Sequence, residues 1–201
     1  MTELRWAADG SDAAVVEHVA ALIARGPCTL ALPGGATPQP MYAALAACDL
    51  PWAGVTMVPG DERLVPEGHP ASNVGQLRAA FGATGATILP LAEEMAVPRL
   101  DLAWLGVGLD GHIASLFPNA DPRADAPAAV VRVVPEPLPA DAPFERLTLT
   151  LAALAAAGEI IVVARGAAKR ALLEAAATGA NDLPVARLLA AAPRVTIFWS
   201  E

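Results

Sequence analysis

Hydrophobic positions along the chain follow two patterns, short apolar or alternating runs and longer segments with apolar residues three or four positions apart. The first pattern is typical of β-strands and the second of amphipathic helices. Strands are predicted at 3–7, 28–32, 54–59, 88–91, 100–105, 129–134, 146–151, 160–164 and 195–199. Helical segments are predicted at 12–25, 38–45, 72–81, 92–97, 152–157, 167–177 and 184–191.

Strands and helices alternate through most of the chain, and several strands are apolar throughout. This pattern predicts an α/β fold of three layers, with a mainly parallel, Rossmann-like sheet and helices on both faces. In such a sheet the carboxyl ends of the strands gather on one edge, where ligands bind. Four candidate side chains lie a few residues past the ends of predicted strands: Thr37, Arg63, His112 and Lys169. With 201 residues, no internal repeat and no long linker, we expect a single domain spanning 1–201.

Residues 118–143 interrupt the alternation. Loops rich in proline, alanine and aspartate, at 119–127 and 135–143, flank the predicted strand at 129–134. Loops of this kind often carry function on a rigid scaffold, so we expect a flexible flap here.

Composition narrows the functional classes. Although 55% of the residues are hydrophobic, no apolar run is long enough for a transmembrane helix, and Glu3, Arg5 and Asp9 do not suit a signal peptide. A net charge of −8 argues against a nucleic-acid-binding surface. We therefore expect a cytoplasmic protein that acts on a small molecule, without nucleic-acid or membrane partners.

Cysteine and lysine usage add two details. Cys28 and Cys48 are predicted to be small buried thiols, and no His/Cys cluster has zinc spacing, so no metal is expected. The chain has twelve arginines and a single lysine, Lys169. Because arginine is the usual cation of this chain, the one lysine is a candidate functional residue.

The segment 33–38 leads from a predicted strand into a helix through Gly34 and Gly35. Thr37 before Pro38 predicts a hydroxyl N-cap followed by proline at the first helical position. Backbone N–H groups and the helix dipole make such a start a phosphate site, although a plain tight turn has the same pattern. It is not a P-loop, because no Gly-Lys-Ser/Thr follows.

Asp61, Glu62 and Arg63 form a dense charge cluster just past the strand at 54–59. The two carboxylates are predicted to hold Arg63, whose planar guanidinium suits a phosphate or carboxylate. The alternative is a surface ion-pair cluster.

The stretch 105–118 begins at the end of a predicted strand and carries Asp110 and His112 among three glycines. Of the three histidines, only His112 has this glycine-lined, strand-end setting. The same glycines fit G-x-G-x-x-G, but the first βα turn and long helix of a dinucleotide site are missing, which disfavours NAD.

Taken together, these motifs resemble the 6-phosphogluconolactonases, within the larger family that includes glucosamine-6-phosphate deaminases. The matching pieces follow family order and cover most of the chain: Gly34–Pro38, Asp61–Arg63 with Val65–Pro66, Ser72–Asn73, Gly106–His112, Ala114–Pro118, Arg146–Thr150 and Lys169.

The resemblance also separates lactonases from deaminases. Deaminases usually have Asp-Glu-Tyr where this chain has Asp61-Glu62-Arg63, and Phe-Asn-Glu-Pro where it has Ser115-Leu116-Phe117-Pro118, so the glutamate that assists ring opening is absent. Ile113 is the deaminase-like choice. The family often has a lysine between prolines near 135–139, and this chain has none. The residues at 61–63 and at 115–118 favour the lactonase, and only Ile113 favours the deaminase.

The resemblance therefore implies a carboxylic ester hydrolase that converts 6-phospho-D-glucono-1,5-lactone to 6-phospho-D-gluconate in the oxidative pentose phosphate pathway. It implies no cofactor, and we expect a monomer. The phosphate would lie on Gly34, Gly35 and Thr37, with Lys169 and Arg146 neutralising it; the sequence leaves open whether Arg146 or Arg132 reaches it.

His112 would take a proton from the attacking water, as a neutral imidazole does near physiological pH. Arg63 or glycine-loop N–H groups would stabilise the oxyanion, and either Asp110 or Asp61 would orient His112 or Arg63. The alternatives are a glucosamine-6-phosphate deaminase-like isomerase and a non-catalytic sugar-phosphate-binding protein.

Overall fold

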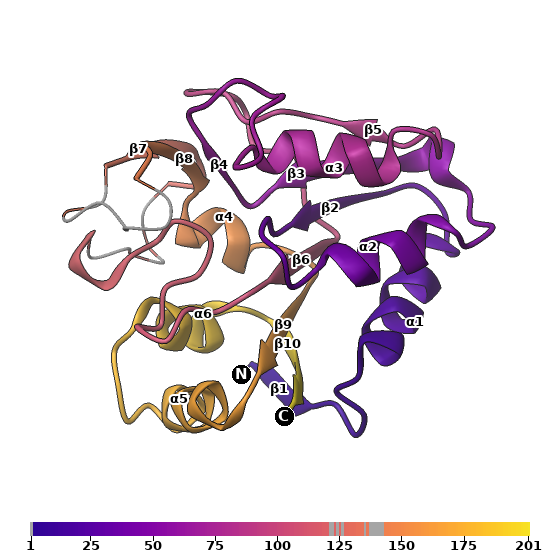
Figure 1. Cartoon of the computed structure of the whole chain (residues 1–201). Helices are drawn as coiled ribbons and strands as arrows, with labels where there is room; N and C mark the ends of the chain where they lie inside the picture. Colours follow the sequence, from indigo (N-terminus) through magenta and orange to yellow (C-terminus); the bar gives the residue numbers. More distant parts are fainter. Residues whose placement is uncertain (1, 121–122, 124, 126, 135, 137–142) are drawn as a thin grey trace.

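The computed structural model describes residues 2–120, 123, 125, 127–134, 136 and 143–201 (Figure 1). In the described part of the chain, a parallel sheet has the order β1-β10-β9-β6-β2-β3-β5. Its strands are β1 (Glu3–Trp6), β2 (Cys28–Leu32), β3 (Val55–Pro59), β5 (Thr87–Ile88), β6 (Leu102–Leu105), β9 (Glu159–Arg165) and β10 (Arg194–Ser200).

Helices cover both faces of this sheet, as Figure 1 shows. One face carries α1 (Asp12–Ile23), α2 (Gln39–Ala46) and α3 (Asn73–Phe81). The other carries α4 (Leu151–Ala155), α5 (Ala167–Ala177) and α6 (Pro184–Ala191). The described part of the chain also contains two short 3-10 turns, η1 (Trp52–Gly54) and η2 (Pro118–Ala120). None of the helices described is long and apolar enough to cross a membrane.

The central strand β6 shows why the sheet needs helices on both sides. Leu102 and Trp104 pack into the cluster of α1–α3, whereas Ala103 and Leu105 pack into the cluster of α4–α6. Successive side chains of a strand point to opposite faces, so an entirely apolar strand must be covered twice. The predicted three-layer, mainly parallel α/β fold is therefore confirmed.

A second, antiparallel sheet of order β4-β8-β7 was not predicted. It consists of β4 (Asp61–Arg63), β8 (Arg146–Leu149) and β7 (Val130–Val133). The sequence interpretation described residues 61–63 as a charge cluster just past a strand and did not assign them to a strand of their own. Three consecutive charged residues have no strand pattern, and only the pairing of Asp61 with Thr148 and of Arg63 with Arg146 makes the segment extended.

The smaller differences between the predicted and the observed elements lie in segments that bury little apolar surface. The first helix ends at Ile23 rather than at residue 25, and the fifth strand is Thr87–Ile88 rather than 88–91. No helix forms at 92–97, where Glu94 has a φ of 61°. The conformation of a short polar segment depends on its turns more than on the periodicity of its sequence. The predicted flap at 118–143 lies partly outside the described residues.

The order of the strands reverses direction between β2 and β6. From β2 the chain proceeds to β3 and β5 on one side, and from β6 to β9 and β10 on the other. Such a switch point leaves a crevice at the carboxyl ends of the two strands, where ligands bind in open α/β sheets. The loops that follow β2 and β6 are the two glycine-rich segments at 33–38 and 106–112.

Both cysteines are free thiols. Cys28 is buried, and burial followed by the nearby Asp101 carboxylate raises its pKa to about 11. Cys48 is half-buried. Among the described residues, no group of three or more His, Cys, Asp or Glu side chains is placed to hold a metal ion.

Candidate active site

A cavity of about 310 Å³ opens at this switch point. It is lined by Pro33, Gly34, Thr37, Pro38, Met41, Asp61, Arg63, Trp104, Gly106, Val107, Gly108, His112, Ala114, Arg146, Val163, Arg165 and Lys169. Most of the candidates thus line one cavity: Gly34, Thr37, His112 and Lys169 lie there with Asp61, Arg63 and Arg146 of the second sheet. Gly35 and Asp110 are not among the lining residues. A wider cavity of about 870 Å³ lies beside α5 and α6, but its charged side chains, Asp182 and Arg187, pair with each other.

The cavity at the switch point is strongly cationic in an acidic protein. Four basic side chains line it against one carboxylate, that of Asp61, whereas the whole chain has a net charge of −8. A crevice lined by one sign of charge concentrates the field and attracts oppositely charged ligands. The site is therefore suited to an anion. Its cations are Arg63, Arg146, Arg165 and Lys169.

Lys169 lies in the first turn of α5 and is half-buried. Burial lowers the pKa of its ammonium group, because a charged group loses hydration inside the protein. Within the described residues no carboxylate forms an ion pair with it. The one lysine of the chain is thus an uncompensated cation that faces the cavity, and an anionic ligand would supply the missing counter-charge.

Arg165 is a pocket residue that the sequence analysis missed. It ends β9, and its guanidinium donates to the carbonyl oxygen of Ala164 (3.0 Å) and to Asp12 Oδ1 (2.5 Å). The sequence did contain a pattern that points to it: a basic residue at the end of an apolar strand and just before Gly166. The same kind of pattern made Arg63 a candidate. Arg165 was not considered because the strand was predicted from the apolar run at 160–164, which stops one residue earlier.

The imidazole of His112 is held by Asp110. His112 Nδ1 lies 2.6 Å from Asp110 Oδ1, and the same oxygen accepts the backbone N–H of His112 at 3.2 Å. The ring also packs against Phe117, with centroids 4.9 Å apart. With Nδ1 donating to the carboxylate, Nε2 keeps its lone pair and can accept a proton. The structure therefore pairs His112 with Asp110 and not with Asp61.

The carboxyl group of Asp110 stays ionised in this arrangement. Partial burial raises its pKa, but hydrogen bonds from the backbone and ring of His112 outweigh that effect, and the net pKa lies below its usual value. An ionised Asp110 favours the tautomer with hydrogen on Nδ1 and stabilises the imidazolium that forms when Nε2 is protonated.

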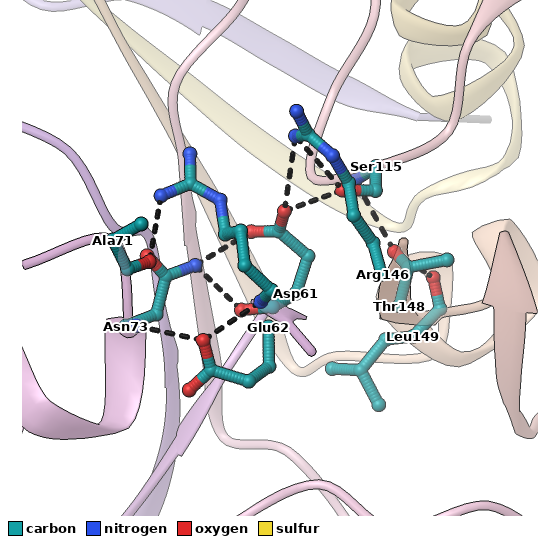
Figure 2. A network of polar contacts seen from close by, with 9 residues as sticks. Asp61, Glu62, Ala71, Asn73, Ser115, Arg146, Thr148 and Leu149 are labelled. Atoms are coloured by element: carbon teal, nitrogen blue, oxygen red, sulfur yellow. Dashed lines mark hydrogen bonds and ion pairs between the residues drawn. The ribbon is translucent and has the colours of Figure 1, made fainter. Parts of the chain in front are cut away.

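Asp61 belongs to a buried polar network (Figure 2). Its Oδ2 accepts the hydroxyl of Ser115 at 2.5 Å and lies 4.0 Å from Arg146 Nη1, while Oδ1 accepts from Asn73 Nδ2 at 3.1 Å. Both Asp61 and Arg146 are buried. Asp61 therefore compensates the charge of Arg146 and joins the second sheet to the loop after β6.

Glu62 caps α3 and does not hold the side chain of Arg63. Its two oxygens accept the backbone N–H groups of Asn73 (2.8 Å) and Val74 (2.7 Å), which are free donors at a helix start. Arg63 Nη1 instead donates to the carbonyl oxygen of Ala71 at 3.0 Å. The prediction that both acids hold this guanidinium was wrong. The strand turns Glu62 to the face opposite Arg63, and Asp61, on the same face as Arg63, accepts from Ser115 and Asn73 instead.

The phosphate-site candidates after β2 differ in their roles. A Cβ on Gly34 would lie 1.7 Å from Asn73 Oδ1, so any larger residue here would have to displace the buried side chain of Asn73. Gly35 donates its N–H to Gln76 Oε1 at 3.0 Å. Thr37 lines the cavity but is not the N-cap: α2 begins at Gln39, after Pro38. Pro40 occupies the first turn of α2, where its missing N–H costs nothing.

The structure distinguishes two arginines that the sequence left open. Arg146 lines the cavity. Arg132 lies on β7 and pairs with Glu145 and Glu93 at the surface. Of these two, only Arg146 is among the residues that line the cavity.

Fold and site together define a class: a Rossmann-like α/β protein with a cationic switch-point pocket that contains an aspartate-supported imidazole. The sequence matches the family of glucosamine-6-phosphate isomerases/6-phosphogluconolactonase over residues 5–93 and 83–199. A 6-phosphogluconolactonase of Mesorhizobium japonicum is 37% identical over 90% of this chain and 84% of its own length. The chain belongs to the glucosamine-6-phosphate isomerase/6-phosphogluconolactonase family.

Solved structures show the same fold. A 6-phosphogluconolactonase from Shewanella baltica superposes with a TM-score of 0.82 at 24% identity, covering 100% of this chain and 98% of the other. A monomeric glucosamine-6-phosphate deaminase superposes with a TM-score of 0.81 at 16% identity, covering 100% and 98%. Because both activities occur on this fold, the choice between them depends on the site residues.

Proposed function

We propose that the chain is a 6-phosphogluconolactonase that hydrolyses 6-phospho-D-glucono-1,5-lactone to 6-phospho-D-gluconate. The observation that carries the proposal is one cavity lined both by His112, whose Nδ1 is held by Asp110, and by Lys169, whose ammonium forms no ion pair within the described residues. The first serves ester hydrolysis and the second serves a phosphate. Family membership and the names of the relatives support the same reaction.

The phosphate end of the substrate is assigned to the side of the cavity formed by the segments after β2 and β9. Lys169 supplies a charge that no carboxylate of the described residues balances. Thr37 supplies a hydroxyl, and Gly34 lets the backbone come close to the ligand. Arg146 adds a second, partly compensated charge. Charge-assisted hydrogen bonds of this kind are about twice as strong as neutral ones, so the phosphate supplies much of the binding energy.

The lactone end is assigned to His112. Its Nε2 takes a proton from a water molecule, and the resulting hydroxide attacks C1 of the lactone. A tetrahedral oxyanion forms, for which Arg63 and the N–H groups of the loop after β6 are the donors in reach of the cavity. When the C1–O5 bond breaks, the imidazolium returns its proton to O5, which leaves a hydroxyl at C5 and a carboxylic acid at C1. The acid then releases its proton to solvent and becomes the carboxylate of the product.

Deamination is the competing reaction of the family. At the position of the deaminase glutamate this chain has Phe117, whose ring packs against His112 and lies 5.5 Å from the guanidinium of Arg146. An aromatic ring cannot transfer a proton in ring opening. This favours lactone hydrolysis over amino-sugar chemistry.

A direct assay tests the proposed function. Purified protein is expected to accelerate hydrolysis of freshly generated 6-phosphogluconolactone above its spontaneous rate, and to release no ammonia from glucosamine 6-phosphate. Binding of 6-phosphogluconate without acceleration would instead identify a sugar-phosphate-binding protein. Ammonia release would identify a deaminase.

Asp110→Asn should lower kcat by about tenfold or more, since the imidazolium loses its counter-charge. The pH dependence of stability gives an independent check. Because the pKa of Asp110 is lowered in the folded protein, its stabilising contribution is complete above the unfolded pKa of about 3.9 and is lost as the pH falls through the lower folded value. The difference in Tm between wild type and variant should therefore be constant above that pH and vanish below it. A difference that persists in acid would contradict this role.

Gly108→Ala tests the packing of the loop against His112. A Cβ at this position would lie 2.2 Å from His112 Nδ1 and 2.5 Å from Asp110 Oδ1, so the imidazole must move. Displacement of a catalytic group by about 1 Å costs on the order of 100-fold in rate. Gly68→Ala is the control, since a Cβ there meets no atom within 4 Å. Equal kcat in the two variants would refute the steric argument.

We also propose that the enzyme acts as a monomer and as one domain. A single chain supplies every side chain named for the pocket. Light scattering after size exclusion should give the chain mass of 20.5 kDa, and one cooperative unfolding transition is expected. A dimer mass, or two separate transitions, would contradict these statements.

A further inference from the structure

The helix that carries Lys169 begins without a side-chain cap. Its N-cap is Gly166, with a φ of 86°, and no side chain accepts a hydrogen bond from the first turn. The turn is instead tied to the end of β10. The N–H of Gly166 donates to Ser200 O at 2.9 Å, and its carbonyl oxygen accepts the indole Nε1–H of Trp199, also at 2.9 Å.

Arg170, the next residue after Lys169, is stacked between two indole rings. Its guanidinium carbon lies 4.5 Å from the ring centroid of Trp6 and 4.6 Å from that of Trp199. Its Nε also donates to Glu174 at 2.7 Å, one turn along α5. Trp6 belongs to β1 and Trp199 to β10, which are neighbours in the sheet, and Figure 1 shows the C-terminus of the chain beside β1.

These contacts hold the residues on both sides of Lys169. Gly166 is fixed through its backbone and Arg170 through its side chain, so the intervening turn of helix has little freedom. Glycine at a positive φ gives a helix start no stiffness of its own, and a helix end without a cap tends to fray. Cation–π contacts and an indole hydrogen bond supply the missing restraint. None of Trp6, Trp199 and Arg170 lines the cavity.

We propose that Trp199, Trp6 and Arg170 are positioning residues that place Lys169 in the substrate pocket. They do not line the cavity, and they act on the substrate only through the ammonium group of Lys169. The assignment of that ammonium to the substrate phosphate rests on the proposed function, whereas the placement itself does not.

The single lysine allows a test that needs no enzymatic activity. Reductive methylation with 13C labels the side chain of Lys169 and the α-amino group, which titrates near pH 8 and is thereby distinguished. In wild type, burial lowers the pKa of Lys169. Trp199→Phe removes the indole N–H without changing charge, so the labelled lysine should become more exposed and its pKa should move up toward the ordinary value of about 10.4.

Trp52→Phe is the matched control. Trp52 also donates its indole Nε1–H to a backbone carbonyl, that of Cys48 at 3.2 Å, but it lies in the core on the side of α1–α3. Its loss should lower Tm and leave the pKa of Lys169 unchanged. If Trp199→Phe does not fold, Trp6→Phe provides the same measurement, because it weakens the stack and leaves the hydrogen bond to Gly166 intact.

A double-mutant cycle supplies the second readout. Trp199→Phe should raise KM for the phosphorylated lactone about fivefold, the size expected for one neutral hydrogen bond, with kcat unchanged. In a Lys169→Ala background the same substitution should have no effect on KM, because the group it positions is gone.

An unchanged lysine pKa in Trp199→Phe would overturn the proposal, and so would an equal rise in KM with and without Lys169. The proposed function fails separately, if wild type does not hydrolyse the lactone. In that case the titration of the labelled lysine still decides whether the stack positions it.

Discussion

Replacing His112 with alanine is expected to lower kcat by about 10²–10⁴-fold, the usual contribution of a general acid–base group, and to leave KM nearly unchanged. The imidazole accepts a proton only as the reaction proceeds, so its removal affects the transition state more than the bound substrate. The measurement is a continuous lactonase assay corrected for spontaneous hydrolysis. It should be paired with 6-phosphogluconate binding, which the variant should retain.

His18→Gln is the control for this substitution. His18 lies on α1, with Nε2 3.2 Å from Glu159 Oε1, at the amino end of β9 and hence at the opposite edge of the sheet from the cavity. The control should affect stability and leave kcat at the wild-type value. Wild-type turnover in His112→Ala would exclude this imidazole as the base.

Replacing Lys169 with alanine is expected to raise KM roughly 10- to 100-fold, as the loss of a charge-assisted hydrogen bond to a phosphate implies. The effect should depend on the phosphate. With unphosphorylated glucono-1,5-lactone, wild type and variant should have the same kcat/KM. This pair of substrates separates phosphate recognition from a general disturbance of the pocket.

A matched cation provides the control for Lys169. Arg78 lies on α3 and pairs with Glu67 at the surface, 2.7 Å away, so Arg78→Ala removes one positive charge without touching the cavity. Its KM should equal that of wild type. An equal loss of affinity for both lactones in Lys169→Ala would remove the ammonium from the phosphate site.

Buried strands carried most of the fold information in the sequence. The apolar runs around β2, β6 and β9 require helices on both faces, and this alone predicts a layered parallel sheet. Residues 61–63 could not be assigned in this way. Their strand conformation arises from pairing with Arg146–Thr148, which lie far away in the sequence.

The site was partly predictable for a related reason. A parallel sheet brings strand ends together, so Thr37, Arg63, His112 and Lys169 could be placed on one edge before the structure was known. The hydrogen-bond and ion-pair partners of the charged residues could not be predicted in this way. Asp110 reaches His112 through a tight glycine turn, whereas Asp61 turns to Ser115 and Arg146, and only side-chain directions separate these two outcomes.

A crystal structure with 6-phosphogluconate bound would test the central claim most directly. The account predicts the phosphate within hydrogen-bonding distance of Lys169 Nζ and the hydroxyl of Thr37, and the C1 carboxylate beside Nε2 of His112. A phosphate bound beside His112, or a ligand bound outside this cavity, would contradict it.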